Sequence, residues 1–214
     1  MTRPSLGRAL PMALLLALAA CSSGSGRSFA RYYDPQGLFT ANLPAANDIT
    51  VAPPQPSSGG PGILSGVIAS PPQPSPSPQS ALGGGLDLGQ TGSTDQTIYE
   101  AFVVTTDSFS SLSDMTLYFL TRDPSIDVQL EQSIRFDGMP GKLVVADVVR
   151  GGSPAAGVAV VLSLGTDGTG YLVAAIFPPG TWDGERADFL DVVGSFRVDV
   201  PPGIATFPVT SGAA

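Results

Sequence analysis

The feature that most constrains the fold is a series of extended runs, separated by turn signals, between residues 126 and 177. The first run, 126–136, alternates apolar and polar side chains, except that Gln132 falls on the apolar face. This period of two predicts a strand with one face in water. The sequence Asp-Gly-Met-Pro-Gly at 137–141 then predicts a turn.

The runs that follow are too apolar to leave one face in water. The run from Lys142 to Arg150 is apolar on both faces between these two ends, apart from Asp147. The runs 157–164 and 171–177 flank a glycine-rich loop, which predicts a hairpin. Strands of this kind need cover on both sides of their sheet. We therefore expect an α+β fold in which helices cover an antiparallel sheet.

Two segments are candidates for the covering helices. Apolar side chains at helical spacing favour a helix over 111–121, although a strand over 116–121 also fits this run. The run 182–193 predicts a second helix, with Thr181 as its N-cap and Gly194 as its C-cap. The apolar stripe of this second helix contains Trp182, Phe189, Leu190 and Val193.

Two further β elements lie nearer the N-terminus. Residues 31–44 predict a small hairpin around the turn at 34–37, because Pro35 presets φ and Gly37 suits the end of the turn. The aromatic and β-branched run 98–105 predicts a strand. These elements add strands on either side of a long segment of different composition.

That segment, residues 50–95, is rich in Pro, Ser and Gly, and Asp87 is its only charged residue before Asp95. Such a composition cannot bury a core, so we expect a disordered or polyproline-like insert. One apolar island, 63–68, interrupts it. The island either docks loosely on the domain or forms a recognition patch for a partner or for lipid.

The N-terminus has the order of a secretory signal. Arg3 and Arg8 precede a short apolar core, which is too short to span a bilayer. Small residues then lead to Cys21, the only cysteine in the chain. One interpretation is a cleaved signal followed by a free thiol. However, Leu-Ala-Ala-Cys at 18–21 resembles the lipobox of bacterial lipoproteins, which implies a signal peptide over 1–20 and lipid attachment at Cys21.

Lipidation would account for a cysteine that has no partner for a disulfide. Residues 21–29 would then form a lipidated tether, and its Gly/Ser-rich part, 22–28, reaches at most about 25 Å. We expect the protein on the outer face of the plasma membrane, or on the outer membrane in a diderm host. The lipid anchor would hold the folded domain close to that membrane.

The charge balance limits the other partners. The chain has a net charge of −8, and removal of a signal that contains Arg3 and Arg8 lowers it by two, to about −10. An acidic surface repels nucleic acid and anionic headgroups. We therefore expect no nucleic-acid partner and no polybasic membrane-binding patch.

The sequence offers few groups for catalysis. Since it contains no histidine, Ser-His-Asp and Cys-His arrangements and histidine metal sites are excluded. The loop at 165–170 looks like a phosphate loop, but it lacks the lysine and the following helix, so a hairpin turn is favoured. We expect no cofactor and no metal.

The last predicted helix carries the remaining candidates. Its acidic side chains form a solvated face, a pair of acid catalysts or a calcium site, although their spacing matches no calcium loop. Trp182 either packs this helix on the sheet or stacks on a ligand. The acidic residues are Asp183, Glu185, Asp188 and Asp191.

Several short patterns occur in a characteristic order. A hairpin of the type Tyr-x-Asp-Pro-x-Gly-Leu-Phe comes first, Asp-Gly-x-Pro-Gly precedes a strong apolar strand, and the last helix runs into Phe-x-x-Val-x-x-Ser-Phe. This order resembles the PsbP-like family, in the form of actinobacterial lipoproteins of the LpqN/LpqT type. The resemblance implies a PsbP-like α/β/α sandwich over 30–200, interrupted by the 50–95 insert and followed by a flexible tail over 201–214. The residues that carry it are Asp34, Pro35, Gly37, Pro44, Asp137, Gly138, Pro140, Phe189, Val192, Ser195 and Phe196.

These observations predict a membrane-anchored extracytoplasmic lipoprotein that acts as a non-enzymatic binding or adaptor module. Its partner would be a protein or another component of the cell envelope. Two alternatives stay open: a carrier of a small apolar ligand held between sheet and helix, and an enzyme that uses the carboxylates of the last helix.

Overall fold

The described part of the chain consists of two sheets and two helices. The computed structural model describes residues 26–56, 61–72, 96–106, 109–121 and 124–198 of the 214-residue chain. The larger sheet contains β3 (Asp48–Ala52), β4 (Ile63–Ser70), β5 (Ile98–Thr105), β6 (Ile126–Phe136), β7 (Met139–Arg150), β8 (Ser153–Leu164) and β9 (Thr169–Phe177). The smaller sheet contains β1 (Phe29–Tyr33), β2 (Phe39–Pro44) and β10 (Arg197–Val198). The helices are α1 (Leu112–Thr121) and α2 (Trp182–Ser195).

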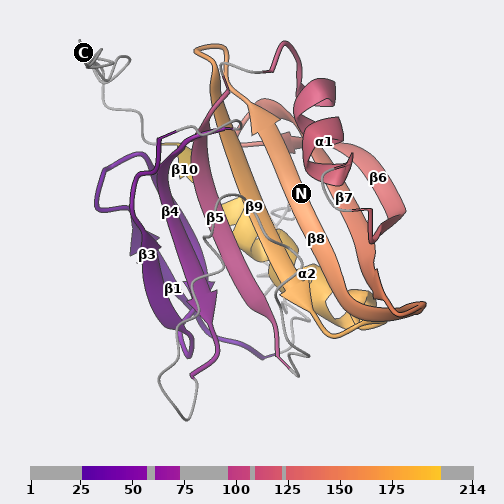
Figure 1. The fold of residues 1–214 in the computed structure, drawn as a ribbon. Coiled ribbons are helices and arrows are strands. Elements are labelled where there is room, and N and C mark those ends of the chain that lie inside the picture. The colour runs from indigo at the N-terminus through magenta and orange to yellow at the C-terminus, as the bar shows by residue number, and fades with distance from the viewer. Residues whose placement is uncertain (1–25, 57–60, 73–95, 107–108, 122–123, 199–214) are drawn as a thin grey trace, which may run out of the picture.

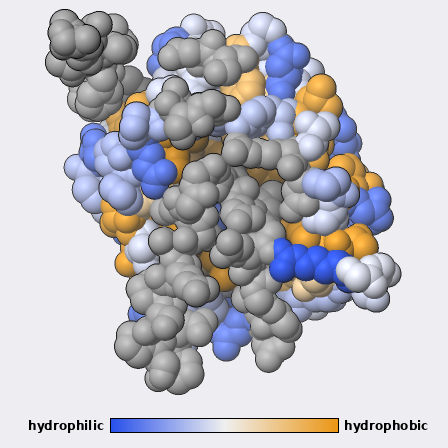
Figure 2. Space-filling view, viewed as in Figure 1, coloured by the Kyte–Doolittle hydropathy of each residue, from blue (hydrophilic) through white to orange (hydrophobic). Residues whose placement is uncertain are grey.

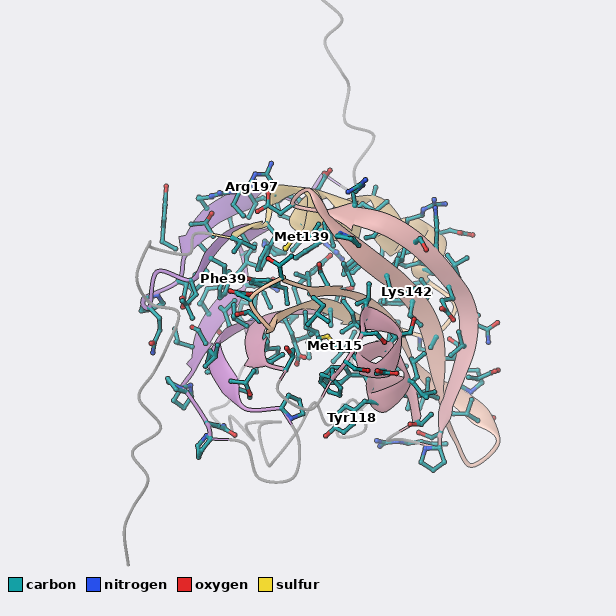
Figure 3. All side chains as sticks on the ribbon, turned by 90° about the horizontal axis from the view of Figure 1, so that it is seen from above. Phe39, Met115, Tyr118, Met139, Lys142 and Arg197 are labelled. Atoms are coloured by element: carbon teal, nitrogen blue, oxygen red, sulfur yellow. The ribbon has the colours of Figure 1, made fainter. Side chains whose placement is uncertain are left out.

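The seven strands of the larger sheet lie in the order β3-β4-β5-β9-β8-β7-β6, and all neighbours are antiparallel. The helix α2 lies behind this sheet and α1 lies in front of it (Figure 1). A view from above places Phe39 and Met139 on one side of the sheet, and Met115 and Tyr118 on the other (Figure 3). The expected α+β fold, an antiparallel sheet covered by helices, is confirmed.

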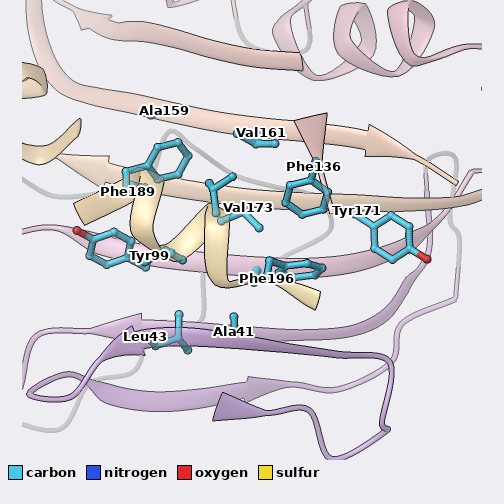
Figure 4. Packing of buried hydrophobic residues seen from close by; sticks show 14 of the residues in the cluster. Ala41, Leu43, Tyr99, Phe136, Ala159, Val161, Tyr171, Val173, Phe189 and Phe196 are labelled. Atoms are coloured by element: carbon cyan, nitrogen blue, oxygen red, sulfur yellow. The ribbon is translucent and has the colours of Figure 1, made fainter. Parts of the chain in front are cut away.

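The larger core fills the space between the sheet and the layer of α2 and β2. Phe196, directly after α2, is fully buried there. Its ring stacks on Phe39 at a centroid distance of 5.1 Å and lies 4.9 Å from the ring of Phe136 and 6.3 Å from that of Tyr171. Figure 4 shows Phe136, Tyr171 and Phe196 between the strands and α2. The end of the last helix is thus fixed by aromatic packing.

The helix expected over 111–121 is confirmed as α1, and the alternative strand is wrong. Met115 and Phe119, four residues apart, are buried in a second core with Phe102 of the sheet. The hydroxyl of Ser111 accepts the N–H of Asp114 at 3.1 Å, which caps the first turn. Neither described helix combines the length and the apolar content needed to cross a membrane.

The expected disordered insert over 50–95 is wrong in its first half. Asp48–Ala52 and Ile63–Ser70 form β3 and β4, and β4 pairs with β5, with Val67 opposite Ala101. The apolar island therefore completes the sheet and does not dock loosely on it. Its glycine has a packing role, because a Cβ at Gly66 would lie 2.2 Å from the ring of Phe102. Residues 73–95 lie outside the described part of the chain.

The strand expected over 126–136 is confirmed as β6, but its apolar face is wrong. Val128 and Leu130 are 41% and 37% exposed, and only Phe136 is buried. The strand lies at the edge of the sheet, and a register shift between Val128 and Leu130 breaks the alternation. An edge strand with a bulge has less core to face than its pattern suggests.

The N-cap of α2 is confirmed in position, and its C-cap expected at Gly194 is wrong. Thr181 occupies the N-cap position, but its hydroxyl donates to the carbonyl of Pro178 at 2.8 Å and makes no capping bond. Gly194 lies inside the helix, which ends at Ser195. The helix ends two residues later than expected because the N–H of Phe196 bonds the carbonyls of the last turn while its ring enters the core.

Candidate functional site

The structure places only some of the residues that the sequence singles out. Cys21, the signal over 1–20 and the tail over 201–214 lie outside the described residues. Of the tether over 21–29, the last part is described: Arg27 makes side-chain contacts with the domain, and Phe29 begins β1. The tether is therefore shorter than its composition suggests.

The contacts of Arg27 gather two of the four acidic side chains of α2. Its guanidinium donates to both carboxylate oxygens of Glu185, at 2.6 and 3.0 Å, and lies 3.2 Å from Asp188. It also donates to the hydroxyl oxygen of Tyr99 at 3.0 Å. Asp183 and Asp191 are exposed and take no part in these contacts. We call Arg27, Tyr99, Glu185 and Asp188 the Arg27 cluster.

Burial determines the electrostatics of the Arg27 cluster. The side chain of Asp188 is 1% exposed and that of Glu185 is 14% exposed, whereas that of Arg27 is 34% exposed. The hydrogen bond to Glu185 is the main cause that raises the pKa of Arg27, and burial raises the pKa of Tyr99. One cation thus neutralises two carboxylates that would be costly to bury alone. The cluster is suited to holding the chain in place.

The Arg27 cluster does not have the composition of a metal site. In the described ranges, no three side chains of His, Cys, Asp or Glu come together in a way that could hold a metal ion. The two acidic residues that do meet are already bound to a guanidinium. The acidic pattern of the last helix therefore divides into an ion-paired half and a solvated half.

The two other sequence candidates have structural roles. The loop at 165–170 is a hairpin turn, as expected: the N–H of Gly165 donates to Thr169 at 2.8 Å, and Gly168 has a φ of 80°. Trp182 packs α2 on the sheet, because its ring stacks on Phe177 and meets Phe189 edge to face. Neither shows a ligand-binding geometry.

One group that sequence reasoning missed is Glu100, in the middle of β5. It lies directly opposite Ile68 of β4 and Ala174 of β9. Two residues further along its strand is Phe102, which packs with α1, so the carboxyl group faces the α1 side of the sheet. The signal in the sequence was an acid inside an otherwise apolar run.

Glu100 is buried without a partner. The residue is 6% exposed, and no described side chain or backbone group bonds or ion-pairs with its carboxyl group. Burial alone raises its pKa to about 7. Among the described residues, the fully buried side-chain oxygens without a hydrogen bond are the hydroxyls of Tyr32 and Thr97, and the carboxyl oxygens of Glu100 are not among them. The charged form of Glu100 is still costly, because the group loses most of its water.

The surroundings of Glu100 are apolar. Along β5 it stands between Phe102, in the core beneath α1, and Ile98, which packs against a small separate cluster. Figure 2 shows hydrophobic side chains of described residues at several places on this face of the molecule, among hydrophilic ones. The small cluster contains Val148, Ala156, Val158 and Ile176. The carboxyl group of Glu100 therefore lies among apolar side chains on the α1 face of the sheet.

Comparisons with known proteins identify the fold. No family model matches the chain, and no curated protein matches its sequence. Among solved structures, the cyanobacterial PsbP protein CyanoP of Synechocystis is similar with a TM-score of 0.52 and 14% identity, over 85% of this chain and 98% of that one. The chain therefore has a PsbP-like fold, as its fold markers implied.

Two further structures are similar at lower scores. A protein of unknown function from Pseudomonas aeruginosa has a TM-score of 0.42 and 10% identity, over 81% of this chain and 98% of that one. The Ran-binding protein Mog1p of Saccharomyces cerevisiae has a TM-score of 0.46 and 12% identity, over 80% of this chain and 96% of that one. At these scores neither similarity bears on function.

Proposed function

We propose that this chain is a lipid-anchored protein on the extracytoplasmic face of a membrane, where its PsbP-like domain acts as a non-enzymatic binding or adaptor module. The observation that carries the proposal is the Leu-Ala-Ala-Cys arrangement at 18–21, six residues before the first side chain that the domain holds, Arg27. Two or three acyl chains on Cys21 would anchor it stably, since each buried CH₂ contributes about 0.8 kcal/mol.

The partner in this proposal is a protein or another component of the envelope near the membrane surface. A net charge of −8 disfavours nucleic acid and anionic surfaces as partners. We propose no catalytic role for the carboxylates of α2, because Glu185 and Asp188 are ion-paired to Arg27. The resemblance of the fold markers to lipoproteins of the LpqN/LpqT type supports the location at the cell envelope in this proposal.

The lipid anchor can be tested by substituting its attachment site. In its bacterial host, the wild-type chain is expected in the membrane fraction, with an intact mass equal to residues 21–214 plus the lipid. Cys21→Ser, which removes the sulfur that takes the lipid, is expected to leave that fraction or to keep its uncleaved signal. The control Ser22→Ala should behave as wild type. Cys21→Ser protein with the wild-type mass and membrane content would contradict the proposal.

The adaptor role needs its own measurement. Chemical cross-linking in intact cells, followed by capture from detergent-solubilised membranes, is expected to yield a defined cross-linked species for the wild-type chain. The Cys21→Ser chain should lose it, because the partner would be met only at the membrane. A wild-type chain that cross-links to nothing beyond what Cys21→Ser yields would contradict an adaptor role and leave the anchor intact.

A second candidate function rests on Glu100, whose buried carboxyl group has no described partner. The domain would carry a small ligand with an apolar body and one cationic or hydrogen-bond-donating group, which Glu100 would bind. Native mass spectrometry of the chain purified from its host is expected to show a bound small molecule, and Glu100→Gln is expected to reduce its occupancy. Protein that is free of any such molecule would contradict the carrier function.

A further inference from the structure

The strands of the larger sheet bring a defined set of turns to one end of the domain. At this end β4, β7 and β9 terminate, and β3, β5, β6 and β8 begin, as their antiparallel registers require. The described turns that meet there are 45–47, 151–152 and 178–181. We call this the entry end, because β1 also begins there, with Phe29 opposite Pro44 at the end of β2.

The Arg27 cluster lies at the entry end. Glu185 belongs to the first turn of α2, which follows the turn at 178–181, and Tyr99 is the second residue of β5. Arg27 joins these two elements through a guanidinium fork with both oxygens of one carboxylate. A fork of this kind fixes direction as well as distance. These bonds therefore hold the chain just before β1 at a defined point on the domain.

Little chain remains between this point and the proposed lipid. Only residues 22–26 separate Cys21 from Arg27, and a fully extended chain from Cys21 to Arg27 spans about 20 Å. The strand β8 has 12 residues and is about 40 Å long at 3.3 Å per residue. The tether is thus about half the length of the domain, and it is attached at one end.

Charge does not distinguish the two ends of the sheet. None of the described turns at the entry end contains a charged residue, but Asp48, Asp127, Asp183 and Arg150 lie beside them. At the opposite end, Asp137 is 3.8 Å from Arg197, and Arg135 donates to the carbonyl of Gly138. What distinguishes the entry end is the attachment of the tether.

We propose that the entry end faces the lipid surface that holds Cys21, and that the Arg27 cluster fixes the domain in this orientation. The inference rests on the proposed lipid anchor and adds to it the surface that meets the membrane. The turns at 137–138 and 165–168, together with β10, where the described chain ends, then point away from the bilayer and toward a partner. The lipid anchor and its short tether limit the distance between domain and membrane, and the Arg27 cluster determines which end of the domain faces the membrane.

The two ends of β8 allow a matched test. Ser153→Cys and Thr166→Cys each place one thiol at an exposed position, at the entry end and at the opposite end. In the mature lipoprotein the sulfur of Cys21 carries the lipid, so only the introduced thiol takes a fluorescent donor. The full lipidated chain is placed in vesicles of phosphatidylcholine and phosphatidylglycerol that contain a headgroup-linked acceptor. Energy transfer is expected to be several-fold stronger from position 153 than from position 166.

Further variants separate the effect of the Arg27 cluster on orientation from the effect of tether length on distance. Arg27→Ala is expected to reduce the difference between the two positions. Arg186→Ala, which removes an exposed arginine from α2, the helix that Arg27 contacts, should preserve it. Ten Gly/Ser residues inserted after Gly24 keep the cluster intact and should lower the transfer from position 153. Equal transfer from both positions of a vesicle-bound chain would overturn the orientation and leave the anchor standing. A chain that does not float with the vesicles would overturn the anchor, and the orientation with it.

Discussion

Glu100→Gln is expected to stabilise the domain above neutral pH. In the unfolded chain Glu100 ionises near its ordinary pKa of 4.5, whereas burial raises the pKa in the folded domain to about 7. Between these values the folded state binds the proton more tightly, so stability is full below pH 4.5 and falls as the pH rises to 7. At about 1.4 kcal/mol per pKa unit, the loss is about 3 kcal/mol.

The variant should remove this loss, because a glutamine stays neutral. Urea denaturation of the two chains is expected to give similar free energies of unfolding at acid pH, and a gain of about 2–3 kcal/mol for Glu100→Gln above pH 7. The control Glu131→Gln, on the exposed edge strand, loses only its ion pair with Lys142 and should change stability by less than about 1 kcal/mol. Parallel pH profiles for wild type and Glu100→Gln would contradict the buried state of this carboxyl group.

Arg27→Ala is expected to destabilise the domain by about 2 kcal/mol at neutral pH. The substitution leaves Asp188, 1% exposed, and Glu185, 14% exposed, without their guanidinium. Removing one partner from a fully buried pair costs about 3–5 kcal/mol. The loss is smaller here because the side chain of Arg27 is itself 34% exposed and water screens part of the interaction.

Two companion variants make this measurement specific. Arg186→Ala removes an exposed arginine from α2 and should change the free energy of unfolding by less than about 0.5 kcal/mol. Arg27→Lys keeps the charge but cannot bind both oxygens of Glu185, so its stability should fall between Arg27→Ala and wild type. If Arg27→Ala unfolds at the same urea concentration as Arg186→Ala, the cluster does not stabilise the domain.

Local patterns predicted much of the fold. The hairpin of β1 and β2 follows from its turn, where Asp34 accepts the N–H of Leu38 at 2.9 Å and Gly37 has a φ of 71°. The central strands and α1 follow from periodicity, because their apolar side chains face the cores at the expected spacing. Each of these features depends on residues within a few positions of one another.

The missed features depend on distant residues. The strand β4 contains several small side chains, and its place in the sheet is set by pairing with β5 across the segment that contains the Pro-rich run. The bond between Arg27 and Glu185 joins residues 158 positions apart. The local sign of Glu100 is an acid in an apolar run, but its burial depends on the neighbouring strands, where it lies opposite Ile68 and Ala174. Neither the composition of a segment nor the periodicity of its apolar residues can predict contacts between distant parts of the chain.

The pairing of β10 with β2 has a consequence for how the chain folds during synthesis. Val198 lies opposite Phe39, so the smaller sheet joins the first and the last described strands of the domain. Contacts of such large sequence separation form slowly, and this one must wait until almost the whole domain has left the ribosome. A nascent chain that ends before Phe196 lacks both the third strand and the ring that packs on Phe39 and Phe136. Completion of the domain is therefore delayed to the end of translation, which suits a protein that would cross a membrane as an unfolded chain.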